Sequence, residues 1–425
     1  MKRKLYPGFW QFLSCLLLGS VSVAKSQEQL NLDSCYVFAK RNYPLIKQHE
    51  LIEKTTAYTL DNASKGYLPQ VGVNGQASYQ SDVTRIPIPT TGMSIPTLTK
   101  DQYKIYGEIA QPLTDVLIIN QQKQLIKNNA SVEEEKLEVE LYKLKERVNQ
   151  LYFGALLIDA QLQQTELLKK DIQSAIAKTT AAFENGTALK SNVNVLKAEL
   201  LKAEQRKVEL MANRRGFIQM LGLLINKPVT ENIQLLVPAS KSVTLTNNRP
   251  ELRMFDAQKN IFAAQEKLIS ARTIPRLSLF FQGGYGKPAL NMLDPNWDFY
   301  YIGGLRLSWN LSAFYTFKKD KKIVFINQDL MEVQRQVFLF NTQLSITQQQ
   351  AELNKIEALI KTDEEILSLR TSIKATANAQ LENGTITAID YVSYVNAEDQ
   401  AKQNKFTHQL QLLMAQYTTQ TLSGN

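Results

Sequence analysis

The chain has 425 residues, of which 44% are hydrophobic and 21% charged, and a formal net charge of +9. This composition excludes a disordered tail and a polytopic helical membrane protein. There are only two cysteines, Cys15 and Cys35, and two histidines, His49 and His408. Disulfide scaffolds, Cys/His zinc sites and Ser-His-Asp nucleophiles therefore have little support. We predict no catalytic residue, metal site or cofactor, and expect both histidines to be structural, because no carboxylate or cysteine is grouped with them at the sequence spacing of metal ligands.

Residues 1–26 read as a secretory signal peptide. Basic residues at positions 2–4 precede an apolar run at 12–18, and Ala24 and Ser26 fit the −3 and −1 positions of a cleavage before Gln27. The apolar run is too short to span a bilayer. Removing the segment takes away four basic residues and no acid, so the net charge falls from +9 to +5. We predict an exported protein that does not bind nucleic acid.

The remainder contains two tandem copies of one unit. Tyr-Leu-Pro at 67–69 corresponds to Thr-Ile-Pro at 273–275 with an offset of 206, whereas Glu-Asn-Gly-Thr recurs identically at 184–187 and 382–385 with an offset of 198. The difference of eight residues indicates a longer hairpin loop in the first copy. The predicted divisions are repeat 1 at 27–225, a linker at 226–246 and repeat 2 at 247–425.

Each copy has the same order of elements. A helix is expected first, at 33–64 and at 248–272. Alternation of apolar and polar residues then predicts two strands in each copy. These strands are expected at about 69–80, 101–112, 275–286 and 299–311.

Long helices are predicted after each strand pair. No proline lies between Pro112 and Pro228 or after Pro295, and each copy has room there for a helix of about 70 residues, about 105 Å long. Apolar residues spaced four and three apart predict a coiled-coil seam in the first copy. This seam comprises Leu137, Leu141, Leu144, Val148, Leu151, Ala155, Ile158 and Leu162. Each Asn-Gly-Thr corner turns the chain, and helices return at about 191–221 and 389–422.

The strands have a composition suited to a membrane barrel. Four strands cannot close a barrel, and an open edge is not tolerated in a bilayer, but three chains would supply twelve strands. Aromatic residues such as Tyr79, Tyr285 and Trp309 are typical of rings at a membrane interface. A soluble sheet with one wet face has the same alternation and stays open as an alternative. Six residues on the apolar parity are predicted to face lipid: Val71, Val73, Ile105, Leu279, Leu305 and Leu307.

The duplicated order of helix, strand pair, long helix, turn and helix resembles the TolC-type outer-membrane efflux proteins over nearly all of the chain after residue 26. The strand entries Leu68-Pro69 and Ile274-Pro275 and the Gly-x5-Asp element from Gly384 to Asp390 support this resemblance. The resemblance implies a mainly α fold with a small β part. It implies a homotrimer with a 12-stranded β-barrel in the outer membrane and an α-helical coiled-coil barrel in the periplasm.

The resemblance also implies partners and a function. A periplasmic adaptor and an inner-membrane pump of the RND or ABC type are expected to dock onto the helices. The protein would then be a non-enzymatic exit duct of a tripartite efflux or type I secretion system, passively conducting substrates to the exterior. The alternative is a periplasmic coiled-coil adaptor or scaffold without a barrel, although an adaptor usually has one helical hairpin and this chain has two.

Candidate functional residues lie at the helix corners. Corner geometry alone demands glycine, and the resemblance implies in addition that the corners receive the adaptor. These residues are Asn185, Gly186, Thr187, Asn383, Gly384 and Thr385.

Asp390 has two competing roles. It is either an acid that stabilises a helix N-terminus or, as the resemblance implies, part of the periplasmic aperture, where Asn192 occupies the matching position. Three carboxylates around one axis would repel one another and raise the pKa of some of them. The resemblance implies a second acid where this chain has Ser393 and a basic residue that could latch the aperture where it has Ile386. We therefore expect one weak acidic ring, and an aperture held closed by helix packing more than by salt bridges.

Overall fold

The structure, a computed structural model, describes residues 29–84, 98–230, 232–241 and 246–425. The predicted signal peptide and most of the first hairpin loop lie outside these residues. The chain forms two compact units. The first contains the segments up to Phe38, Gln150–Ala239 and Ile366–Thr407, and the second contains Ala39–Asn149, Ser240–Glu365 and His408–Asn425. Each unit draws on both predicted repeats, and each is described by itself.

The first predicted helix is broken by a proline. Instead of one helix over 33–64, the structure has α1 (Leu32–Asn42), a 3-10 turn η1 (Pro44–Ile46), α2 (Lys47–Ser64) and a second turn η2 (Lys65–Tyr67). Tyr43 is extended, with φ −63° and ψ 132°. Proline has no amide hydrogen, and its ring disfavours the helical conformation of the residue before it, so the helix stops at this point.

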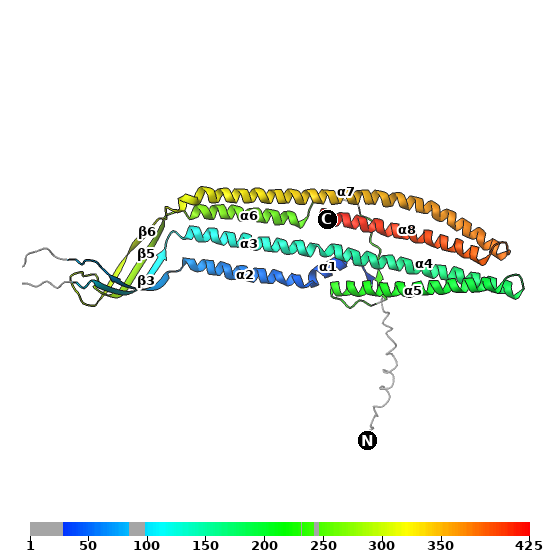
Figure 1. Cartoon of the computed structure of the whole chain (residues 1–425), viewed down its shortest axis with the longest axis horizontal. Helices are drawn as coiled ribbons and strands as arrows, with labels where there is room; N and C mark the ends of the chain where they lie inside the picture. Colours follow the sequence, from blue (N-terminus) through cyan, green and yellow to red (C-terminus); the bar gives the residue numbers. More distant parts are fainter. Residues whose placement is uncertain (1–28, 85–97, 231, 242–245) are drawn as a thin grey trace, which may run out of the picture. The chain divides into compact units, whose positions relative to one another are not determined.

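The second unit contains a four-stranded antiparallel sheet (Figure 1). Its strands are β2 (Gln70–Tyr79), β3 (Asp101–Pro112), β5 (Arg276–Lys287) and β6 (Asp298–Ser308). Their order is β2-β3-β5-β6, so β2 and β6 are the edges among the described residues. Each repeat contributes one hairpin, and the central β3–β5 pair joins the two repeats.

The two hairpins pair in equivalent registers. Gln70 lies opposite Ala110, and Arg276 lies opposite Ser308. These pairs differ by the two repeat offsets, 206 on the first strand and 198 on the second. The side-chain amide of Gln111 donates to the Tyr67 carbonyl at 3.0 Å, and the indole of Trp309, its counterpart, donates to the equivalent Thr273 carbonyl at the same distance. The eight extra residues of repeat 1 therefore lie in its loop and leave the pairing unchanged.

The helices follow the predicted order. They are α3 (Val116–Tyr142), α4 (Leu144–Glu184), α5 (Lys190–Ile225), α6 (Pro250–Ala271), α7 (Ala313–Glu382) and α8 (Ala388–Ser423). The 70 residues of α7 confirm the predicted long helix in repeat 2, whereas the corresponding helix of repeat 1 is interrupted at Lys143. In the second unit, α3 packs against both α2 and α6.

A short parallel pair between the start of repeat 1 and the linker was not predicted. Strand β1 (Gln29–Leu30) pairs with β4 (Gln234–Leu235). The hydroxyl oxygen of the buried Tyr152 lies 2.7 Å from the carbonyl oxygens of Leu30 and Leu236, which ties both segments to α4. Strands of two residues are too short to show a periodic pattern, so the sequence contains no signal for them.

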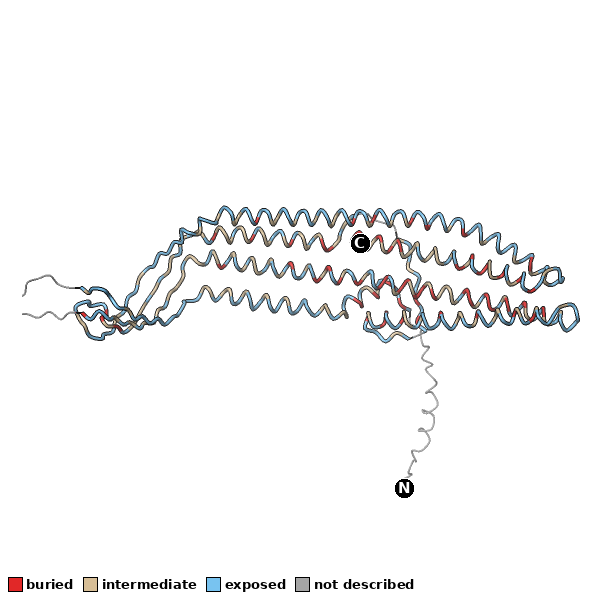
Figure 2. The backbone as a smooth tube through the Cα atoms, in the orientation of Figure 1, coloured by how far each residue is buried: buried red, intermediate tan, exposed pale blue. Residues whose placement is uncertain are grey.

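Most of the buried residues belong to helices, as Figure 2 shows by the red stretches along them, while the strands are mainly exposed or intermediate. Within the predicted seam, Leu151 and Leu162 are half-buried and the other six residues are buried. Cys35 is also buried, and this burial raises the pKa of its thiol to about 12. No helix among the described residues combines the length and apolarity needed to cross a membrane.

Candidate functional site

The two helix corners have the same backbone structure. Gly186 and Gly384 have φ values of 72° and 69°, in the left-handed region. The amide of the threonine that follows each glycine donates to the carbonyl five residues earlier, at 2.8 Å for Thr187 and 2.9 Å for Thr385, and the threonine hydroxyl donates to the same oxygen. This is a Schellman C-cap. A Cβ on either glycine would meet no atom within 4 Å, so backbone conformation, and not crowding, requires glycine.

Asp390 forms a capping box at the start of α8. Its carboxylate accepts the backbone amide of Thr387 at 3.0 Å and the Thr387 hydroxyl at 2.6 Å. The amide of Asp390 in turn donates to the Thr387 hydroxyl oxygen at 3.2 Å. These bonds from the Thr387 side chain and backbone lower the pKa of Asp390. In one chain Asp390 is thus a helix-end acid, which is the first of its two expected roles; the ring remains a prediction.

The matching corner of repeat 1 lacks this box. Leu189 precedes α5 and has no side-chain bond to the helix, and Asn192 donates its amide to the Leu189 carbonyl at 3.0 Å. Thr-x-x-Asp before a helix is a sequence pattern that predicts a capping box. The capping box at Thr387 could therefore have been predicted from the sequence, as could its absence at Leu189.

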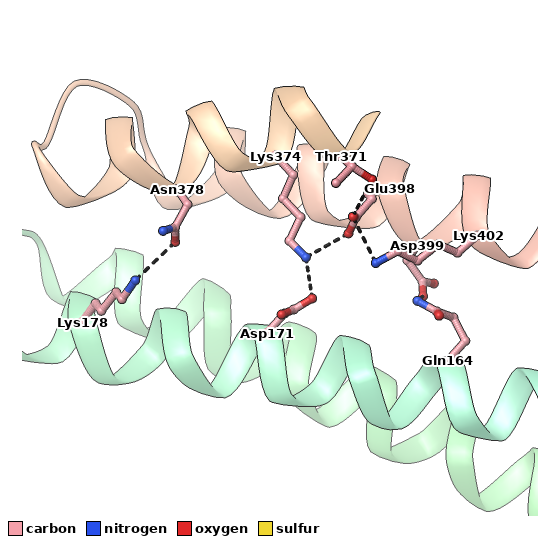
Figure 3. Close-up of polar contacts among 9 residues, drawn as sticks. All are labelled: Gln164, Asp171, Lys178, Thr371, Lys374, Asn378, Glu398, Asp399 and Lys402. Carbon is pink, nitrogen blue, oxygen red and sulfur yellow. Dashed lines mark hydrogen bonds and ion pairs between the residues drawn. The ribbon is translucent and has the colours of Figure 1, made fainter. Parts of the chain in front are cut away.

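Close to these corners, ion pairs join the helical hairpins of the two repeats (Figure 3). The Nζ atom of Lys374, on α7, lies 2.5 Å from Oδ2 of Asp171 on α4 and 2.8 Å from Oε2 of Glu398 on α8. Glu398 is buried and also accepts bonds from Lys402 and Thr371. Burial opposes its ionisation, but the bonds from Lys374 and Lys402 outweigh burial and lower the pKa of Glu398. We refer to Asp171, Lys374 and Glu398 as the lysine bridge.

The neighbouring residue Asp399 has the opposite character. It is buried and accepts the side-chain amides of Gln164 at 3.0 Å and Gln403 at 2.5 Å, while Nη1 of Arg206 lies 3.7 Å away. Burial raises the pKa of Asp399 despite these contacts. The two adjacent acids therefore titrate differently, because one faces a lysine and the other faces mainly amides.

An apolar cluster lies beside the lysine bridge. It comprises Leu168, Ile172, Ala175, Leu196, Ala203, Ala377, Ala388, Tyr391 and Val395. Nearer the corners, Lys178 on α4 pairs with Glu382 at the end of α7. In this part of the described chain, ion pairs therefore join the two repeats beside the apolar cluster, while the expectation that packing outweighs salt bridges in closing the aperture stays a prediction. The partners lie far apart in sequence on separate helices, so no local pattern predicted them.

His408 pairs with an acid on a neighbouring helix. Its Nδ1 atom lies 2.5 Å from Oδ2 of Asp363, a buried acid on α7. The two residues are 45 positions apart and meet only because α7 and α8 pack together. His49 lies exposed on α2. No group of three or more potential metal ligands comes together among the residues that the structure describes.

The sheet has one apolar and one polar face. The register places Val71 opposite Ile109, Ile105 opposite Tyr285 and Leu279 opposite Leu305, and directly paired residues project to the same side of a sheet. All six residues predicted to face lipid therefore share one face, and all are exposed in the single chain: Val71, Val73, Ile105, Leu279, Leu305 and Leu307.

The other face bears a charged group. Nη1 of Arg306 lies 2.6 Å from Oε1 of Glu108, and the amide of Gln282 donates to Oε2 of Glu108 at 2.5 Å. The Arg306 guanidinium also lies over the Phe280 ring, 4.4 Å from its centroid. A sheet that is apolar on one face and charged on the other is suited to a lipid–water boundary.

Comparison with known proteins identifies this architecture. No protein-family model matches the sequence, and a search of curated proteins gave no match. Several solved structures are similar. CusC has 14% identity and a TM-score of 0.65 over 93% of this chain and 92% of its own. The CmeC outer membrane channel of Campylobacter jejuni has 13% identity and a TM-score of 0.63 over 92% and 85%. The open state of the Neisseria gonorrhoeae MtrE outer membrane channel has 13% identity and a TM-score of 0.65 over 93% and 89%.

These similarities establish the fold. The chain has the fold of the outer-membrane channels, mainly α with one four-stranded sheet, as the resemblance to TolC-type proteins predicted. At 12–14% identity the similarity does not extend to individual residues, so the roles of Asp390 and of the corners follow from their local geometry alone.

Proposed function

We propose that this protein is a subunit of an outer-membrane channel, a passive exit duct through which substrates leave the periplasm. The observation that supports it most is the four-stranded sheet. One face of this sheet is apolar and exposed, the other is polar around Glu108, and its edge strands β2 and β6 have no partner on their outer sides among the described residues. An open edge in lipid leaves backbone groups unpaired, so the sheet must be completed by other copies. Three copies give twelve strands, with the polar face toward a water-filled lumen.

The helices would then extend into the periplasm and end at the Asn-Gly-Thr corners. An adaptor and a pump of the RND or ABC type are the partners that the resemblance implies, with the corners as docking points. The chain's own contribution is a conduit, and energy for transport comes from the pump. The lysine bridge holds the hairpins of the two repeats together near the corners, so we propose that it limits the opening there, with Asp390 from three chains forming a cation-attracting ring.

Membrane fractionation tests the proposal. The protein expressed with its own leader is expected in outer membranes as a trimer that survives mild detergent and gives ion conductance in planar bilayers. The alternative, a periplasmic adaptor or scaffold, predicts a soluble periplasmic chain without conductance. Recovery of the protein in that fraction, with the signal segment cleaved and the helices folded, would reject the channel.

A further inference from the structure

An ion pair on the polar face of the sheet joins two strands that are not neighbours. Glu108 lies on β3 and Arg306 on β6, with β5 between them. Nη1 of Arg306 lies 2.6 Å from Oε1 of Glu108, and Nη2 lies 3.4 Å from Oε2. The side-chain amide of Gln282, on the intervening strand, also donates to Glu108. We refer to Glu108 and Arg306 as the sheet pair.

The side chain of Arg306 lies against the sheet. Its guanidinium carbon is 4.4 Å from the centroid of the Phe280 ring, and Phe280 lies opposite Gly304 in the register of β5 and β6. A Cβ on Gly304 would already lie 3.4 Å from Cε1 of Phe280, so a larger side chain there would displace the ring. An arginine that stacks on a ring and binds a carboxylate through two nitrogens has a fixed orientation. The positive charge is therefore held close to the surface of the sheet.

The two members of the sheet pair occupy the same position in the two repeats. At the offset of 198, which applies to the second strand of each hairpin, Glu108 corresponds to Arg306. The two hairpins pair in equivalent registers, so both residues lie at the same place in their hairpins. One repeat thus has an acid where the other has a base. Charges of opposite sign at one duplicated position cancel within each chain.

The polar face of the central strand β3 is the more enclosed of its two faces. From Asp101 to Ala110, residues of the apolar parity are exposed, whereas those of the polar parity, among them Lys104, Tyr106 and Glu108, are half-buried. Side chains on the concave side of a curved sheet converge and shield one another from solvent. In the proposed channel, on which this inference rests, the polar face surrounds the lumen.

We propose that the sheet pair cancels the charge of the barrel lumen and so lets solutes of either charge sign pass. Three copies would place three acids and three bases at equivalent positions around the lumen, which makes a neutral ring. The same charged residue in both repeats would instead give six like charges, and a ring of like charges selects against ions of that sign. The contact with Phe280 also keeps the guanidinium beside the wall and out of the passage.

The charges lie near enough to the axis to act on the whole passage. Twelve strands about 4.8 Å apart and tilted by about 40° give a backbone radius of about 12 Å. The Debye length is about 10 Å at 0.1 M salt and about 3 Å at 1 M. Three uncompensated charges about 8 Å from the axis should therefore change the ratio of cation to anion permeability about threefold at 0.1 M and have little effect at 1 M.

Stability alone gives a weaker account of the sheet pair. The side chains of Arg306 and Glu108 are 44% and 17% exposed, and ion pairs that solvent reaches contribute little to stability. A purely structural pair would leave the passage of ions unchanged when its charges are altered. Ion selectivity therefore separates the two accounts.

Charge variants in planar bilayers test the proposal. Glu108→Gln should shift the ratio of potassium to chloride permeability about threefold toward chloride at about 0.1 M salt, and Arg306→Gln about threefold toward potassium. Both shifts should vanish at about 1 M salt. The double variant Glu108→Gln/Arg306→Gln is the matched control, because it loses the contact without a change in net charge, and it should have the wild-type ratio. Lys104 on the same face is present in all these channels, so each shift is measured relative to the wild type.

Chemical modification gives a second measurement on channels that are already assembled. In a Cys35→Ser background, Arg306→Cys should favour cations, and a cationic methanethiosulfonate should return the wild-type ratio. An anionic methanethiosulfonate should increase the preference for cations further. Conducting trimers in which the single variants and both modified forms of Arg306→Cys keep the wild-type ratio would overturn the inference and leave the channel intact. A wild-type chain without conductance would remove both.

Discussion

Removal of Lys374 should loosen the helical hairpins near the corners. Lys374→Met keeps the length of the side chain but leaves buried Glu398 and partly exposed Asp171 without their shared partner. Loss of one member of a buried ion pair costs about 3–5 kcal/mol when the other charge stays unpaired. Glu398 retains Lys402 at 3.0 Å and Thr371 at 3.1 Å, and the more exposed Asp171 pair contributes about 0–1 kcal/mol. We therefore expect a loss of about 2 kcal/mol, most of it from Glu398.

Native-state hydrogen exchange measures this loss locally. Amides of α7 and α8 around Lys374 and Glu398 should exchange about thirtyfold faster in Lys374→Met, the factor for about 2 kcal/mol, while those of the sheet stay unchanged. A double-mutant cycle then apportions the energy. Coupling of Lys374→Met with Glu398→Gln should exceed its coupling with Asp171→Asn. Equal and negligible coupling in both cycles would refute the assignment of the bridge as a stabilising link.

The pH dependence has a definite sign. The pKa of Glu398 lies below its ordinary value in the folded chain, so its contribution is fully present above the unfolded pKa of about 4.3 and disappears as the pH falls through the folded value. Acidification below that range should therefore loosen the same amides in the wild-type protein and have less effect on Lys374→Met. In an Asp399→Asn background, which removes the neighbouring acid with the opposite shift, a local stability that rises on acidification would contradict the lowered pKa of Glu398.

Four further outcomes are expected. Leu305→Arg should cost about 2–4 kcal/mol of barrel stability at mid-strand, whereas Asn74→Arg on the polar face should be tolerated; equal urea midpoints for the two would reject the membrane face. Gly384→Ala should destabilise its corner by about 1 kcal/mol through the left-handed conformation, and bulkier residues there should reduce crosslinking to the adaptor without loss of trimer. Asp390→Asn should reduce divalent-cation block of single-channel current, and unchanged block would leave Asp390 as a capping residue only. Asp399→Asn should stabilise the hairpins at neutral pH. Because burial raises the pKa of Asp399, the stability of the folded chain declines as the pH rises from the ordinary pKa of an aspartate through the raised one, and asparagine removes this loss. Hydrogen exchange of the hairpin amides that is faster than in the wild type would contradict this.

Periodicity and duplication in the sequence determined the order of the elements. The two offsets, 206 and 198, predicted that the extra residues lie in the first hairpin loop, and the equal registers of the two hairpins follow from them. Alternation assigned Val71, Leu279 and the related positions to one face, since side-chain direction along a strand has a period of two. Gly186 and Gly384 were predictable as corners because only a residue without Cβ accepts a left-handed helix end readily.

The tertiary structure decided which side chains meet across helices. Lys374, Asp171 and Glu398 lie on three helices, and His408 finds Asp363 at a separation of 45 residues. A sequence pattern reports the face of one helix and gives neither the rotation nor the axial level of its neighbour, on which such contacts depend. The same limit applied to α3 and α7, whose patterns are alike. Val132 on α3 is 4% exposed and Leu330 on α7 is 56% exposed, and a pattern along one helix does not report which of its residues a neighbouring helix covers.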